Sequence, residues 1–458
     1  MICIQCSSRL FSEKKYIFDT IFSEWFDISY QVKIAPSVSG FLIQLPNDSS
    51  LHLSSIFWDG VSEGYLEKNS LPKVCYIENE FTLEKNIPLL YGDKLLEVGS
   101  SSINCGIDVF AACFFMLSRM EEPIIAERDS HGRFPATAST AFKYDFLERP
   151  IVDEYVEMLW NMLSKLDGSL QRKKRAPSNF ITCDVDWPFD PIRRSFYRTL
   201  RSTLSDVVRK RRLLSALTTL LVYLKHSIGL AHKDGYREAV TWIMNENERV
   251  GNKVAFYFIT ENTDKLDSDS DFDSVEIREL FRDIHSRGHE IGLHPGYNCF
   301  NNPELFKKSA VTLKRILKEE GINQSLLGGR MHYLRWDAVI TPKLWNDNGF
   351  DYDSTLAFAD KAGFRCGTCH SFPMFDLVNR KALNVIQKPL INMECTIIDQ
   401  RYEALGVLGE GALKRFLFFK HEVYKHKGDY VLLWHNTHLN VDEEENIYKE
   451  VISLNDYN

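Results

Sequence analysis

The chain has 458 residues, of which 44% are hydrophobic and 26% charged, and its formal net charge is −8 at pH 7. This composition is typical of a folded protein with more than one core, and it excludes disordered and fibrous classes. The negative charge also disfavours nucleic-acid binding, which depends on neutralising phosphates with Lys and Arg.

The first 175 residues mix helical and extended patterns and predict a small α/β domain of unknown role. A polar segment with Gly and Pro, Gly168 to Asn179, predicts a linker after it. The first residues lack the basic and apolar regions of a secretory signal, so we expect a cytoplasmic protein. Helices are predicted at Tyr16–Phe26, Ile107–Leu117 and Val152–Leu166, and strands at Tyr30–Ile34, Gly40–Leu45 and Val74–Ile77.

From residue 176 to 458, short apolar strands alternate with helical segments, which indicates parallel pairing. We predict a distorted (β/α)7-type barrel here, so that the whole chain is α/β with a smaller domain before the barrel. An open doubly wound sheet is the alternative. The predicted strands are Phe180–Cys183, Val254–Ile259, Glu290–Leu293, Gly328–Tyr333, Tyr352–Leu356, Val385–Leu390 and Tyr430–Trp434.

A basic helical insertion at about 187–252 interrupts the predicted barrel. Its apolar stretch Leu213–Leu224 is shorter than the ~20 residues that cross a bilayer. The insertion is either a solvated basic face or a peripheral contact with an anionic membrane surface. Its basic residues are Arg193, Arg194, Arg198, Arg201, Arg209, Lys210, Arg211 and Arg212.

Several other motifs carry no assigned function. Two cysteine pairs, Cys3 with Cys6 and Cys366 with Cys369, have metal-ligand spacing, but they lie far apart in the chain and lack zinc-knuckle flanks. Reduced thiols are therefore expected. The polar loop containing His131 and Arg133 either touches a ligand or forms a simple turn. Phosphate-loop and Gly-x-Ser-x-Gly patterns are missing from the sequence, which argues against nucleotide binding and a serine esterase.

Three predicted strands end in residues that can carry chemistry. The first ends at Asp184 and Asp186, which project from the same side of an extended chain. The third ends at His294 and the last at His435. Active sites of (β/α) barrels lie at the carboxyl ends of the strands, and imidazole is a common zinc ligand. Taken singly, each residue could instead cap a helix or make a structural hydrogen bond.

The order Thr-x-Asp-x-Asp, Gly-His-Glu-Ile-Gly-x-His-Pro, an Arg-rich strand and Leu-Leu-x-His resembles the polysaccharide deacetylases, carbohydrate esterase family 4, over residues 179–440. The likeness is greatest to a bacterial branch with an extra N-terminal domain. It implies Asp184 as general base and His435 as general acid. It further implies that Arg330 orients the base and that the backbone N–H of Tyr333 stabilises the oxyanion.

The same resemblance implies a divalent metal, zinc first, held by Asp186 and His294. The family's second histidine falls four residues after His294, where this chain has Asn298. An amide oxygen is a weaker zinc ligand, so Asn298 predicts weaker binding or a harder cation. His289 and His332 are the alternative ligands.

We therefore expect a metal-dependent hydrolase that removes an N-acetyl group from an amino sugar or polysaccharide precursor during surface polysaccharide synthesis. A non-catalytic carbohydrate-binding protein with a decayed metal site is the first alternative. A glycosidase with two carboxylates is the second, and it would need no metal. The sequence does not identify the sugar or the oligomeric state.

Overall fold

The computed structural model describes residues 1–36, 38–61, 64–191, 199–200, 203–204, 223–224, 234–439 and 441–453. The basic residues of the predicted insertion, from Arg193 to Arg212, lie outside these residues. The membrane contact expected of them therefore stays a prediction.

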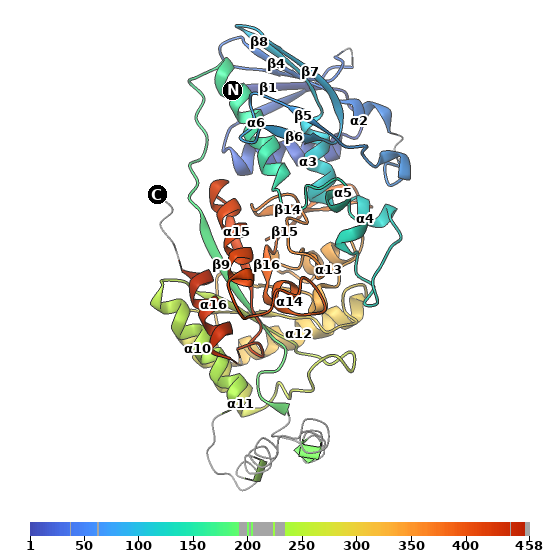
Figure 1. The fold of residues 1–458 in the computed structure, drawn as a ribbon. Helices are drawn as coiled ribbons and strands as arrows, with labels where there is room; N and C mark the ends of the chain where they lie inside the picture. The colour runs from blue at the N-terminus through green and yellow to red at the C-terminus, as the bar shows by residue number, and fades with distance from the viewer. Residues whose placement is uncertain are drawn as a thin grey trace.

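The N-terminal region forms a mixed sheet covered by helices (Figure 1). Its strand order within the described residues is β2-β1-β3-β4-β8-β7, with both parallel and antiparallel pairs. The strands are β1 (Ile2–Cys6), β2 (Tyr30–Ile34), β3 (Phe41–Gln44), β4 (Ser50–Leu53), β7 (Gly92–Val98) and β8 (Ser102–Ile107), with a separate hairpin of β5 (Cys75–Glu78) and β6 (Asn86–Leu89). The helices are α1 (Phe11–Phe18), a π-helix (Asp19–Trp25), α2 (Ile56–Gly60), α3 (Val109–Ser118), α4 (Glu121–Ile124), α5 (Thr140–Lys143) and α6 (Ile151–Leu166), with short 3₁₀ turns at Lys68–Ser70 and Ala136–Ala138.

Helix α3 forms the centre of this region, and every one of its residues is buried. Asp108 caps its N-terminus, and the Asp108 carboxylate accepts hydrogen bonds from the backbone N–H groups of Ala111 and Phe57 and from the indole of Trp58. An Asp at this position satisfies N–H groups that a helix start leaves unpaired. Burial nonetheless raises the pKa of Asp108 to about 7.

The C-terminal region is built on a second sheet, in the order β14-β15-β13-β12-β11-β10-β9-β17-β16. All neighbours pair in parallel except β14 with β15. The strands are β9 (Ser178–Val185), β10 (Val254–Phe258), β11 (Glu290–Leu293), β12 (Gly328–Gly329), β13 (Tyr352–Asp353), β14 (Phe372–Asp376), β15 (Lys381–Gln387), β16 (Asn392–Met393) and β17 (Asp429–Leu433). The helices are α10 (Gly235–Arg249), α11 (Val275–Ser286), α12 (Pro303–Glu319), α13 (Thr341–Asp347), α14 (Glu394–Ile398), α15 (Gly411–Lys425) and α16 (Asp442–Ile452), with a 3₁₀ turn at His332–Leu334.

The second sheet curls without closing. Strands β15 and β16 lie near opposite ends of the strand order, yet only residues 388–391 separate them in the chain. A chain of that length spans less than about 20 Å, so the two ends of the sheet approach each other. The end strands β14 and β16 are not paired within the described residues. The α/β prediction is thus confirmed, whereas a closed seven-unit barrel is not.

The two regions share one hydrophobic cluster and a buried ionic contact. Glu122 of the N-terminal region lies between Arg119 and Arg365, at 3.0 Å and 2.8 Å, and all three side chains are 2% exposed. Burial alone would raise the pKa of Glu122, but the two guanidinium groups outweigh it and lower the pKa. The ionised carboxylate therefore joins the two regions.

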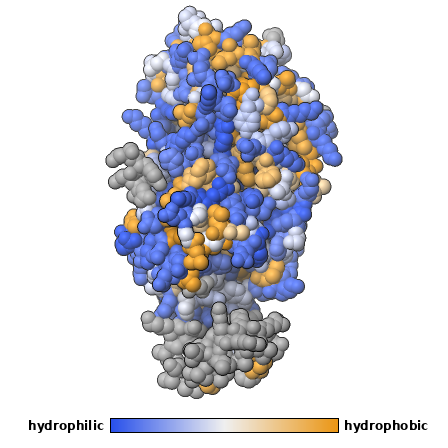
Figure 2. All heavy atoms as spheres, viewed as in Figure 1, coloured by the Kyte–Doolittle hydropathy of each residue, from blue (hydrophilic) through white to orange (hydrophobic). Residues whose placement is uncertain are grey.

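The segment after α6 runs along the outside of the molecule before it enters β9 (Figure 1). Hydrophilic residues cover most of the described surface on the face shown in Figure 2, with hydrophobic residues in small groups between them. Among the described helices, each is too short or too polar to cross a bilayer.

Candidate metal centre and active site

The predicted site residues meet at one rim of the second sheet. Strands β9, β10, β11 and β17 pair in parallel and in register, with Phe258 opposite both Val185 and Leu293. Their carboxyl ends therefore lie side by side. Asp186 and His294 each follow directly from the end of such a strand, and His435 lies two residues beyond the end of β17.

Three side chains at this rim form a compact set of metal donors: Asp186, His294 and His332. The Oδ1 atom of Asp186 lies 3.3 Å from Nε2 of His294 and 3.5 Å from Nε2 of His332. Asp186 Oδ1 and His294 Nε2 are both buried and have no hydrogen-bond partner among the described residues. Buried polar atoms left unpaired are costly. One carboxylate and two imidazoles are a donor set that suits zinc with an open position, so these residues fit a divalent cation.

Both imidazoles are oriented with Nε2 toward Oδ1 of Asp186. Nδ1 of His294 lies 2.6 Å from the carbonyl oxygen of Arg330, and Nδ1 of His332 lies 2.8 Å from Oδ1 of Asp267. Asp267 is itself fixed, because its carboxylate accepts hydrogen bonds from the backbone N–H groups of Thr263 and Tyr297. A hydrogen bond at Nδ1 leaves the Nε2 lone pair for a metal and sets the direction of the ring.

Asn298, the predicted third ligand, makes other contacts. Its side-chain N–H₂ donates to the carbonyl oxygen of Thr263 at 2.9 Å, and its Oδ1 accepts from the guanidinium of Arg335 at 3.3 Å. A neighbouring cation and an engaged oxygen do not favour metal binding. Metal ligation by Asn298 therefore stays a prediction, and these hydrogen bonds argue against it. His289 is also engaged elsewhere, between the backbone N–H of Val254 and Glu248.

Asp184 is buried beside Arg330, as expected. The guanidinium donates to Asp184 Oδ1 at 2.7 Å and to the hydroxyl of Thr182 at 2.9 Å, while two further donors reach Ser354. The second carboxylate oxygen of Asp184 faces His294 at 3.6 Å. Arg330 therefore fixes one oxygen and leaves the other directed at the donor cluster.

His435 lies on the other side of the cluster and is paired with Glu394. Its Nδ1 contacts Glu394 Oε1, and its Nε2 lies 3.9 Å from Oδ2 of Asp186. Burial would lower the pKa of His435, but Glu394 raises it well above its ordinary value. The resulting imidazolium is suited to donate a proton from Nε2.

The cavity over these residues has a volume of about 200 Å³ and includes side chains from both regions of the chain. Tyr333 lines it with a left-handed backbone, φ 60° and ψ 15°, which is rare for a non-glycine residue. Arg133, from the N-terminal region, donates to the carbonyl oxygen of Tyr333 at 3.0 Å and is held by Asp129 at 2.7 Å. The polar loop around Arg133 therefore forms part of the site wall.

Sequence reasoning did not identify Asp267 or Glu394 as parts of the site, and it left open whether the loop with Arg133 touches a ligand. Asp267 lies in a loop between β10 and α11, and Glu394 begins α14, so neither stands at the end of a predicted strand. The signal that could have identified Glu394 is its place in an apolar segment, Ile391-Asn392-Met393-Glu394, because a buried carboxylate needs a partner.

The chain has partial similarity to one sequence family and distant similarity to solved structures. Residues 2–168 match the model of a family of unknown function, DUF7033. No curated protein sequence matches the chain. Among solved structures, one described as a "putative polysaccharide deacetylase from Mycobacterium smegmatis" has 16% identity and a TM-score of 0.40, over 61% of this chain and 84% of its own. The structure of Puue allantoinase has 13% identity and a TM-score of 0.36, over 61% of this chain and 83% of its own. Likeness at this level does not establish a function.

Proposed function

We propose that the protein is a metal-dependent hydrolase that removes an acetyl group from the nitrogen of an amino sugar. The observation that carries this proposal is the donor cluster of Asp186, His294 and His332, which contains buried polar atoms without hydrogen-bond partners. Two side chains suited to proton transfer flank this cluster. On one side is Asp184 with Arg330, and on the other is His435 with Glu394.

The protein's own residues divide the work of amide hydrolysis. Asp184 accepts the proton of the attacking water, because Arg330 keeps one of its oxygens occupied and the other faces the cluster. His435 donates a proton to the departing nitrogen. The backbone N–H of Tyr333 stabilises the oxygen that gains negative charge. Asp186, His294 and His332 would hold a divalent cation, for which zinc is the first candidate. That cation would polarise the substrate carbonyl and lower the pKa of water.

We infer that the substrate is an N-acetylated sugar or polysaccharide precursor and that the reaction serves surface polysaccharide synthesis. The amino-sugar part rests on the motif order in residues 179–440. The cavity over the donor cluster has a volume of about 200 Å³ and would admit at most the reacting end of such a substrate. The protein is expected to act in the cytoplasm.

The alternative of a carbohydrate-binding protein with a decayed site is disfavoured by the buried partners of the two catalytic groups. Arg330 is fully buried beside Asp184, and Glu394 is 1% exposed beside His435. Burying charges is costly, so a binding protein without catalysis would gain little from keeping both pairs.

The test measures two quantities on purified protein: bound divalent metal, by elemental analysis, and acetate released from N-acetylglucosamine oligomers. Wild type should contain about one metal per chain and release acetate, and Asp186→Ala should lose both. Glu304→Ala, which changes an exposed acidic residue of α12, is the control and should keep both. Metal content that is equal in wild type and Asp186→Ala would refute the metal assignment. Wild type that contains no metal and releases no acetate would favour the carbohydrate-binding protein with a decayed metal site.

A further inference from the structure

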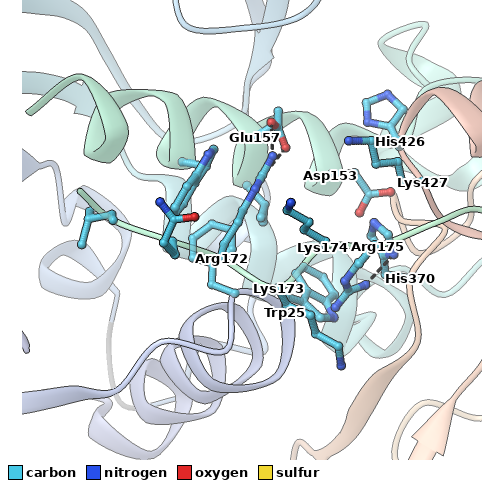
Figure 3. A pocket seen from close by; sticks show the side chains of 15 residues that line it. Trp25, Asp153, Glu157, Arg172, Lys173, Lys174, Arg175, His370, His426 and Lys427 are labelled. Carbon is cyan, nitrogen blue, oxygen red and sulfur yellow. Dashed lines mark hydrogen bonds and ion pairs between the residues drawn. The ribbon is translucent and has the colours of Figure 1, made fainter. Parts of the chain in front are cut away.

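A second cavity lies where the two regions meet, away from the candidate metal centre. It has a volume of about 400 Å³. Its walls come from α6, the end of the π-helix, the segment 170–175, His370 before β14, and His426 and Lys427 just after α15. Figure 3 shows side chains of this segment, among them Lys174 and Arg175, opposite Glu157 and Asp153 of α6. The stretch that the sequence predicts as a plain linker is therefore a wall of a pocket.

The lining carries an excess of positive charge. Its cationic side chains are Arg172, Lys173, Lys174, Arg175 and Lys427, and its carboxylates are Asp153 and Glu157. Glu157 is already paired with Arg172 through two contacts of 2.6 and 2.7 Å. The other four cations have no carboxylate within 4.0 Å among the described residues. Uncompensated cations gathered in a cavity attract an anion.

Among the four cations without a carboxylate partner, Arg175 is held by a histidine. Its Nη1 lies 2.6 Å from Nδ1 of His370, and its side chain is half-buried. Burial and the neighbouring Arg175 lower the pKa of His370 to about 3, so this imidazole is neutral and accepts the hydrogen bond. The guanidinium is thereby held in place with donors left for a ligand. His426 adds a buried Nε2 without a hydrogen-bond partner in the described chain.

A cation site is the competing interpretation, because Asp153, Cys369 and His370 have donor atoms close together. Their hydrogen bonds argue against it. Asp153 accepts from the hydroxyl of Thr368 and from the backbone N–H of Cys369, and Arg175 occupies Nδ1 of His370. A positively charged guanidinium at the ligand nitrogen repels a metal ion.

We propose that this cavity binds a phosphate group, carried by a soluble phosphate ester or by a lipid headgroup. A phosphate monoester offers close to two negative charges and three acceptor oxygens. Arg175 supplies a planar donor group that suits those oxygens, and Lys174 and Lys427 supply additional charge. The site is independent of the proposed hydrolase reaction, because none of these residues lies in the candidate metal centre.

The test titrates the full-length protein with inorganic phosphate, glucose 1-phosphate and vesicles containing phosphatidic acid, and separately with Zn²⁺. Tryptophan fluorescence is the readout, because Trp25 and Trp160 line the cavity. Two variants change the pocket: Arg175→Gln, and the double variant Lys174→Gln with Lys427→Gln, which alters exposed lysines and should fold even if the first does not. Lys307→Gln, an exposed lysine on α12, is the matched control.

We expect phosphate to bind wild type and the control alike, and each pocket variant to weaken binding about tenfold or more, since a hydrogen bond to a charged group is worth that much. Binding of the soluble esters identifies a metabolite as the source, and binding of vesicles alone identifies a lipid headgroup. The proposal is wrong if no phosphate compound binds, if the pocket variants bind as wild type does, or if Arg175→Gln weakens only Zn²⁺ binding.

Discussion

Histidines belong to both the candidate metal centre and the proposed phosphate site, but their surroundings there have opposite charge. His294 lies beside Asp184 and Asp186, which raise its pKa against the effect of burial. His370 lies beside Arg175, which adds to the effect of burial and lowers its pKa to about 3. The same side chain thus belongs to a cation site in one place and to an anion site in the other. The neighbouring charges decide its role, and residue type alone does not.

The largest expected effect comes from replacing one histidine at each site, which tests whether only those of the metal centre take part in the reaction. His435→Asn should lower the rate of acetate release by about 100- to 10,000-fold, because it removes the proposed proton donor. Asp184→Asn should have an effect of similar size, since it removes the acceptor. His370→Asn should leave the rate unchanged. Steady-state kinetics on metal-loaded protein tests all three, and a normal rate in His435→Asn would show that the residue is structural.

The orientation of the metal-site imidazoles provides a second test. Asp267→Asn should weaken divalent-metal binding by about 10- to 100-fold, because it disturbs the hydrogen bond that directs His332. Asn298→Ala is the matched variant and should bind metal as wild type does. Competition with a chelating dye measures both affinities. The reverse result, with Asn298→Ala weaker and Asp267→Asn unchanged, would restore Asn298 as the ligand.

Acidification should destabilise the fold through His370 and His426, the two histidines of the proposed phosphate site. Burial lowers the pKa of His370 to about 3 and that of His426 to about 4. Each contributes stability that is present above the unfolded pKa of about 6.5 and is lost as the pH falls toward the folded value. Between pH 6.5 and 5 the loss should be about 2 kcal/mol for each group, at about 1.4 kcal/mol per pH unit.

Urea unfolding at several pH values measures this slope. His370→Gln should make the stability less dependent on pH over that range, whereas His52→Gln, at an exposed position on β4, should not. If the slope is the same in His370→Gln and wild type, the histidine is not held neutral in the folded protein.

The smallest expected effect concerns the contribution of the N-terminal region to the site. Arg133→Gln should lower kcat/KM by about tenfold or less, which is the usual value of one hydrogen bond, here to the carbonyl oxygen of Tyr333. Metal affinity should not change. Arg128→Gln, at an exposed position of the same loop, is the control. A loss of metal in Arg133→Gln would mean that the loop supports the fold of the rim rather than Tyr333.

Much of the second region could be predicted from the sequence, because its parallel strands are apolar runs that end in Asp or His residues. In the first region, the predicted strand Tyr30–Ile34 agrees with β2 at both ends, but the sequence analysis missed β1, β4, β6, β7 and β8. Strand β7 has no buried residue, so its pattern gives no apolar alternation.

The parts of the site that could not be predicted depend on contacts between segments far apart in the sequence. His332 was weighed as a ligand, but its orientation depends on Asp267, 65 residues earlier in the chain. Likewise, Glu394 meets His435 across 41 residues. Spacing along the sequence carries no signal for pairs of this kind, because the fold alone brings them together.

The carboxylate that Arg119 and Arg365 share also bears on how such a chain can evolve. If recombination joined the C-terminal region to a different partner, the buried Arg365 would lose Glu122, whereas Glu122 would keep Arg119 from its own region. Breaking a buried pair in this way costs about 3–5 kcal/mol, a large part of the stability of an ordinary domain. The two regions are therefore expected to be inherited together and to accumulate compensating substitutions at these positions, rather than to be exchanged between proteins as independent modules.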